Sequence, residues 1–191
     1  MKKLLVLTSM VLLSACSAPK QQQIDFTPQI ISTPRIVVND VAFALTSKDV
    51  RSAQYVALVD SGRSQITPIH SRQNLRLTME HALSEQFAAQ GFRSTTNSDN
   101  NLTIEIQEAL VAVKHSITSH EMNAVMTIEL TVETPRGKLV KSYNGSAQRK
   151  AAFSASNQDI EKVLNDVANL VLNEIANDSE LQTYMKERFN A

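Results

Sequence analysis

Cys16 is the residue whose chemistry is easiest to interpret, because it is the only cysteine among 191 residues. A disulfide within the chain needs a second thiol, so this cysteine must act alone. It follows Leu13-Ser14-Ala15 at the end of an apolar run of about ten residues, which is too short to span a membrane. A positive start at Lys2 and Lys3, an apolar run and small residues before the cysteine are the parts of a secretory signal peptide. We therefore predict that residues 1–15 are a signal peptide that is removed.

The sequence Leu13-Ser14-Ala15-Cys16 resembles the lipobox of bacterial lipoproteins, in which the cysteine sulfur takes a diacylglyceryl group and the peptide is cut before the cysteine. A thiol is the side chain best suited to form a thioether to diacylglycerol. The new amino group then takes a fatty acid such as palmitate, and several acyl chains, at about 0.8 kcal/mol per buried CH₂, hold a protein durably where one chain is marginal. The resemblance implies that Cys16 is a lipid anchor. Ser17, in the place where Asp would retain such a protein, implies the outer membrane and a domain that faces the periplasm.

Metal binding is not expected from the four histidines of the chain. His115 and His120 bracket a short polar segment that is typical of a hairpin tip, so their side chains could approach one another. A zinc site needs a third and usually a fourth ligand, and Glu121 is the only carboxylate nearby. We predict no metal and no cofactor.

Catalytic motifs are equally weak. Ser61 lies in a predicted turn, but the Gly-x-Ser-x-Gly elbow of a hydrolase is missing. The four glycines are isolated, which excludes a phosphate-cradling loop. Glu105, Glu129 and Glu133 line polar strand faces, and two of them could act as acid and base. Solvated strand carboxylates are far commoner, so an enzyme is not the expected class, although sequence alone leaves it open.

Charge argues against nucleic acid as a partner. Loss of Lys2 and Lys3 with the signal peptide leaves 17 of the 19 basic residues against 19 acidic ones, a charge of −2. Nucleic-acid binding depends on clusters of lysine and arginine that displace phosphate counterions.

Residues 16–34 are predicted to be the lipidated cysteine and a tether, because they hold Pro19, Pro28 and Pro34 and a run of three glutamines. If flexible, this tether has a root-mean-square span of roughly 25 Å and a stretched length of about 60 Å. Ile24 and Phe26 are apolar for a linker, which leaves open that the second half docks on the domain as an edge strand. Residues 35–191 are predicted to be a single domain.

The strands are predicted from runs of β-branched and alternating apolar residues. The first three lie in residues 35–45, 54–59 and 66–69. Residues 102–150 are expected to form an antiparallel meander, with a bulge near Gln107 and Glu108 where the apolar alternation changes register. The cleanest alternation is in residues 126–133.

Two amphipathic helices are predicted from apolar residues spaced by three and four. The first, residues 72–90, would be capped by Ser71 and end before Gly91. The second begins at Ser156, whose side chain can form a capping pair with Asp159, and a final helix or kinked continuation runs to Ala191. The predicted fold is therefore α+β, a mostly antiparallel sheet with about three helices packed on one face.

The chain resembles the YajG family of bacterial lipoproteins. The features that carry the resemblance are the lipobox, the paired strands with Asp49-Val50-Arg51, the helix that ends at Gln90-Gly91-Phe92, and the meander before the Ser156 helix. The resemblance implies a small α+β domain on a lipid anchor, akin to lipoproteins that assist envelope transport complexes. It supplies no catalytic residues, and Cys16 is the one position that it assigns.

A binding or adaptor module in cell-envelope assembly, transport or cell-wall maintenance is the expected function. Helices on one sheet face leave the other face open to an envelope protein or a glycan. The alternatives are a cell-wall or glycan hydrolase, which clustered glutamates and histidines would favour, and a carrier of an apolar ligand, which a large internal cavity would favour. The residues predicted to form the partner surface are Thr127, Glu129, Thr131, Arg149 and Lys150.

Overall fold

The fold is described by a computed structural model, which places residues 22–29, 35–62 and 65–189. The predicted signal peptide and Cys16 lie outside these residues. Within the described part of the chain, no helix is long and apolar enough to cross a membrane.

Three long strands form the antiparallel meander that the sequence predicts. β6 (Asn101–His115) pairs with β7 (Ser119–Thr134), and β7 pairs with β8 (Gly137–Ala152). Along β7 the apolar side chains of Met126, Ile128 and Leu130 are buried. The β6–β7 register shifts between Ile106 and Glu108, which confirms the predicted bulge.

Five shorter strands complete the eight-stranded sheet. They are β1 (Gln23–Ile24), β2 (Val41–Asp49), β3 (Tyr55–Asp60), β4 (Ile66–Ser71) and β5 (Phe92–Ser94). β2 and β3 both pair with β6 in parallel, and β5 pairs with β2, and β1 with β4, in the same way. β3 and β4 form the one further antiparallel pair among the described residues. The α+β class is confirmed, and the long ladders are antiparallel as predicted, but the sheet is mixed and contains much parallel pairing that the prediction did not include. Parallel pairs join strands that are distant in the sequence, and alternation within a strand carries no information about them.

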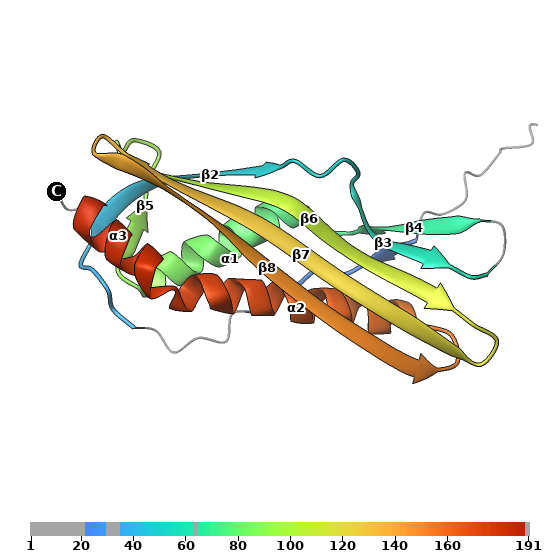
Figure 1. The fold of residues 1–191 in the computed structure, drawn as a ribbon. Coiled ribbons are helices and arrows are strands. Elements are labelled where there is room, and N and C mark those ends of the chain that lie inside the picture. The colour runs from blue at the N-terminus through green and yellow to red at the C-terminus, as the bar shows by residue number, and fades with distance from the viewer. Residues whose placement is uncertain (1–21, 30–34, 63–64, 190–191) are drawn as a thin grey trace, which may run out of the picture.

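Three helices lie on the same side of this curled sheet, which has the shape of half a barrel (Figure 1). They are α1 (Leu75–Ala89), α2 (Asn157–Asn177) and α3 (Ser179–Phe189). The predicted capping pair of α2 is a full capping box between Ser156 and Asp159. α1 begins later than predicted, because Asn74 caps it by accepting the Leu77 N–H, while Ser71 is held in β4 by pairing with β1.

The core fills the space between the helices and the sheet. Phe43, Phe87, Phe92 and Phe189 come from four elements and pack with ring centroids 5.9–6.2 Å apart, at the end of the molecule that holds α3. The apolar stripe of α2 is buried along its length against β6, β7 and β8. This packing leaves the opposite face of the sheet open.

Residues 22–29 are docked on the domain, which is the second of the two possibilities that the sequence left open. β1 adds to the edge of β4, and the side chains of Ile24 and Phe26 are fully buried. Side chains of α2 hold the backbone, since the Asp25 N–H donates to Glu161 and the Thr27 N–H to Asn165.

Candidate functional site

The sheet forks at β6, and the fork lies at the predicted bulge. The first half of β6 pairs with β2, as far as Ile106, and the second half pairs with β3, from Val111 onward. Between these two stretches, residues 50–54 cross from one strand to the next. A fork of this kind leaves backbone carbonyls without ladder partners, and buried carbonyls need a donor.

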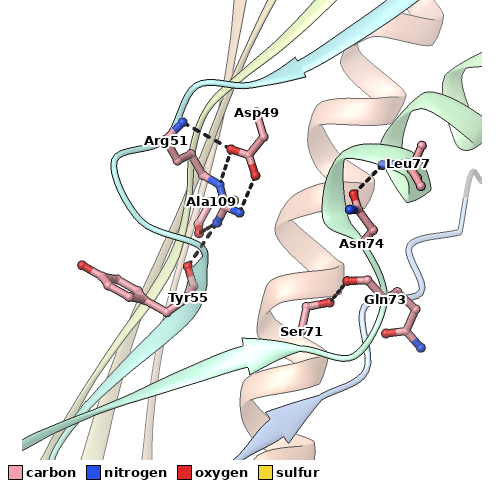
Figure 2. Close-up of polar contacts among 8 residues, drawn as sticks. All are labelled: Asp49, Arg51, Tyr55, Ser71, Gln73, Asn74, Leu77 and Ala109. Atoms are coloured by element: carbon pink, nitrogen blue, oxygen red, sulfur yellow. Dashed lines mark hydrogen bonds and ion pairs between the residues drawn. The ribbon is translucent and has the colours of Figure 1, made fainter. Parts of the chain in front are cut away.

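Arg51 supplies the donors at the fork (Figure 2). Its Nη1 donates to the carbonyl oxygens of Tyr55 (3.1 Å) and Ala109 (3.2 Å). Its Nε and Nη2 donate to the two carboxylate oxygens of Asp49, at 2.9 and 2.8 Å. One guanidinium thus ties the end of β2, the start of β3 and the middle of β6 together, with the bidentate geometry that arginine favours.

The Asp49–Arg51 pair is largely buried, since only 11% of the Asp49 side chain and 6% of the Arg51 side chain are exposed. Burial of Asp49 opposes its ionisation, but the hydrogen bonds and the charge of Arg51 outweigh this, so the pKa of the carboxyl lies below its ordinary value. From the sequence alone, Asp49 and Arg51 are predicted to form a local ion pair, which contributes less than about 1 kcal/mol to stability if it is exposed. Its burial makes it a structural element of the fork.

A hollow of about 440 Å³ opens at the fork on the sheet face opposite the helices. It is large enough for a small ligand or for side chains of a partner. Arg51 also borders a second hollow of about 270 Å³ near Asn74, so this residue lines both hollows. The residues that line the first hollow are Arg51, Ser52, Ala53, Tyr55, Gln107, Glu108, Ala109, Leu110 and Thr127.

The structure brings four of the five predicted surface residues to this open face. Thr127 lines the hollow, and Glu129 lies beside it, accepting a hydrogen bond from Gln107. Thr131 continues the same face, because residues two apart on a strand share a side. Lys150 forms an ion pair with Glu121 at 3.1 Å, farther along the same face.

Arg149 lies on the other side of the sheet. Its cross-strand partner is Met122, which is buried against the helices, and its guanidinium forms an ion pair with Asp166 of α2. The predicted surface therefore divides: Arg149 ties β8 to a helix, and the other four residues face solvent.

The groups considered for catalysis are not gathered in one place. Glu105 and Glu129 are directly opposite each other on β6 and β7, and Glu105 is paired with Lys48. His115 and His120 do approach one another, with ring centroids 6.2 Å apart, but they lie at the far end of β6, about 30 Å from Glu105. Within the residues that the structure describes, no group of three potential metal ligands is present.

Comparison with known proteins places the chain in a family. The model of a family described as "Uncharacterized lipoprotein" matches residues 28–186, which is most of the domain. The chain belongs to this lipoprotein family. Its members are held in the bacterial envelope by a lipid anchor.

The relatives of this lipoprotein agree with the resemblance drawn from the sequence. It is 24% identical to the lipoprotein YajG of Escherichia coli K12 over 190 residues, which cover 97% of each chain. The YajG of a second E. coli strain, O6:H1, matches equally well. The resemblance to the YajG family is thereby confirmed over nearly the whole chain.

A solved structure shares the fold of this lipoprotein. The crystal structure of protein XCC0632 from Xanthomonas campestris, of the family-model DUF330, aligns with a TM-score of 0.60. The match covers 87% of this chain and 98% of the other, at 12% sequence identity. At that identity the likeness concerns the fold alone.

Sequence reasoning missed most of the hollow of this lipoprotein. Tyr55, Glu108 and Leu110 carry no motif, and they meet because β3 joins β6 in parallel just after the bulge. The one usable signal was the break in alternation at Gln107 and Glu108, since bulges often lie next to functional sites.

Proposed function

We propose that this protein is an outer-membrane lipoprotein that faces the periplasm and serves as a binding or adaptor module in envelope assembly, transport or cell-wall maintenance. The observation that carries the proposal is the hollow of about 440 Å³ at the fork, on the sheet face that the helices leave open. Membership of the lipoprotein family supports a lipid anchor. The lipobox supports Cys16 as the lipidated residue, and Ser17 supports the outer membrane as the location.

The fork suits recognition because its walls are joined by the hydrogen bonds of Arg51 and are chemically mixed. Leu110 and Ala53 offer apolar contact, while Glu108 and Thr127 offer a carboxylate and a hydroxyl. The buried Arg51 holds the backbone of three strands in place behind these groups. A preorganised hollow of this kind costs little ordering on binding.

The two rival functions have less support. A hydrolase is not favoured, because the opposed Glu105 and Glu129 lie on an open sheet face, without a histidine beside them. A carrier is not favoured either, because the space between helices and sheet is filled by side chains such as Met79, Met126 and Leu164, each fully buried.

Photocrosslinking in cells tests the adaptor function. We expect a photoreactive residue at Thr127 or Glu129 to capture a discrete envelope protein. The same residue at Leu170, which is 53% exposed on α2, is the control and should capture none of it. Ala53→Trp fills the hollow and should remove the adduct, while circular dichroism shows the fold unchanged.

Adducts of equal yield from Leu170, or an adduct that Ala53→Trp leaves intact, would contradict the fork as the binding site. No protein adduct at Thr127 or Glu129 would contradict an adaptor and leave a glycan or small ligand as the occupant.

Cys16→Ser tests the anchor. A serine hydroxyl is too weak a nucleophile to replace the thiol in lipid transfer, so we expect complete loss of palmitate labelling and of membrane fractionation. Ser17→Ala should keep both. Labelling that persists in the Cys16→Ser variant would show that the anchor lies elsewhere.

A further inference from the structure

One end of the molecule carries exposed apolar side chains. Ile117 is completely exposed, Phe153 is 82% exposed and Ile66 is 59% exposed. Ile117 lies in the β6–β7 turn, Phe153 follows β8 directly, and Ile66 begins β4. Figure 1 shows that the β6–β7 turn, the end of β8 and the β3–β4 hairpin all lie at the end of the molecule opposite α3, with the hairpin set apart from the other two. We call these three residues the apolar tip.

The backbone of the tip is held in place by hydrogen bonds. Phe153 has φ +66°, a left-handed conformation that favours glycine or asparagine. Its N–H donates to the Thr118 carbonyl at 3.0 Å, and its carbonyl accepts from Nδ1 of His120 at 2.8 Å. Neither isoleucine nor phenylalanine is a residue that turns select. A large aromatic kept exposed in a strained conformation indicates a role other than folding.

The chain enters the domain from the direction of the tip. β1 runs parallel to β4, with Gln23 opposite His70, and β4 runs away from the tip from Ile66. Four residues of strand separate Ile66 from His70, which corresponds to about 13 Å. Gln22, whose carbonyl accepts the His70 N–H at 3.2 Å, therefore lies on the tip side of Gln23.

The docking of β1 shortens the predicted tether. Only seven residue steps join Cys16 to Gln23, and they span at most about 25 Å. Gln23 lies opposite His70 of β4, and His70 lies opposite Tyr55 of β3. Arg51 bridges the carbonyls of Tyr55 and Ala109, so Gln23 is level with Ala109 across the sheet. From there to Ile117 is eight residues of β6 and turn, or about 26 Å. A tether of this length that continues in the direction of β1 reaches about as far as the tip, so an anchor at Cys16 allows this end to contact the bilayer.

We propose that the apolar tip contacts the phospholipid bilayer in which the acylated Cys16 is embedded. This inference rests on the proposed anchor, and it adds an orientation to it. Isoleucine and phenylalanine side chains gain from burial at the boundary between headgroups and acyl chains. The hollow at the fork then lies about 26 Å above the membrane surface, on a face that runs away from it.

Tryptophan fluorescence tests the contact, since the chain contains no tryptophan. The lipidated protein carrying Ile117→Trp or Phe153→Trp is reconstituted into vesicles of phosphatidylethanolamine and phosphatidylglycerol with brominated acyl chains. In the vesicles, the indole of each variant should emit at a shorter wavelength than the indole of the same variant in urea without detergent. The bromine atoms of the acyl chains should quench most of this emission. Ile36→Trp is the matched control, at an isoleucine that is 70% exposed near α3, and should lose none. Because all three side chains are exposed, the variants should fold.

Flotation of each variant with the vesicles reports the anchor separately. Protein that floats, with indoles at residues 117 and 153 quenched no more than the indole of Ile36→Trp, would overturn the tip contact and leave the anchor standing. Protein that does not float with the vesicles would overturn the proposed anchor at Cys16, and the tip contact that rests on it would fail as well. Shielding of residue 117 that occurs in cells but not in vesicles would show that a protein covers the tip, and would also overturn the proposal.

Discussion

Replacing Gly91 by alanine is expected to destabilise the fold by about 3–5 kcal/mol, the combined cost of a left-handed backbone and of overpacking. Gly91 follows α1 with φ +94°, and a Cβ built on it would lie 1.9 Å from the carbonyl oxygen of Val38. That carbonyl belongs to the backbone, so no side chain can rotate away. The Val37 and Val38 N–H groups donate to the Gln90 carbonyl in the same place, at 2.9 and 3.2 Å. The alanine must therefore push apart the end of α1 and the chain that leads into β2.

Gly62→Ala is the matched control for this prediction. Gly62 has a similar backbone, with φ +70°, but the nearest atom to an added Cβ is 4.0 Å away. It should lose about 1 kcal/mol from the backbone alone. Urea-induced unfolding followed by circular dichroism measures both. Equal losses in the two variants would show that the close approach at Val38 contributes nothing.

Features set by neighbouring residues were the ones that sequence reasoning predicted well. Three such features are the apolar stripe of α2, its capping box at Ser156 and Asp159, and the bulge at Gln107 and Glu108. Each depends on residues that are close together in the sequence. The cap of α1 was misplaced to Ser71 because serine and asparagine both cap helices, and the choice depends on where β4 stops pairing.

Features that depend on distant contacts could not be predicted. The parallel pairing of β2 and β3 with β6 joins segments about 50 residues apart, and strand patterns are the same for parallel and antiparallel neighbours that face one buried side. The open-face residues Thr127 and Glu129 followed from alternation. The hollow beside them did not, because it exists only where β3 takes over from β2 along β6.

Asp49 and Arg51 illustrate the same limit within three residues. Their spacing predicts a local ion pair, and the structure confirms that they contact. Whether such a pair matters depends on burial, and the burial here comes from β6: the Ala109 carbonyl that accepts from Arg51 is 58 residues away in the sequence. Exposed pairs contribute less than about 1 kcal/mol, whereas breaking a buried pair is costly.

Arg51→Met is accordingly expected to destabilise the protein by about 3–5 kcal/mol, because it leaves the buried Asp49 carboxylate without a counter-charge. It also removes the donor for the Tyr55 and Ala109 carbonyls and the charged group that borders both hollows at the fork. Lys48→Met is the control from the same strand, since the Lys48 side chain is 62% exposed and pairs with Glu105 at 3.1 Å. It should cost less than about 1 kcal/mol. Urea unfolding at pH 7 compares the two.

The pH dependence of this loss separates the charge of Arg51 from its packing. In the wild type, the lowered pKa of Asp49 means that its contribution to stability is complete above the unfolded value of about 3.9 and is lost as the pH falls through the folded value. In the Arg51→Met variant, burial without the cation raises the pKa of Asp49, so the carboxyl takes up a proton and relieves its unpaired charge on mild acidification. The difference in unfolding free energy between wild type and variant should therefore shrink between pH 7 and pH 3. A difference that stays constant over this range would assign the loss to packing and to the two carbonyls, and not to the ion pair.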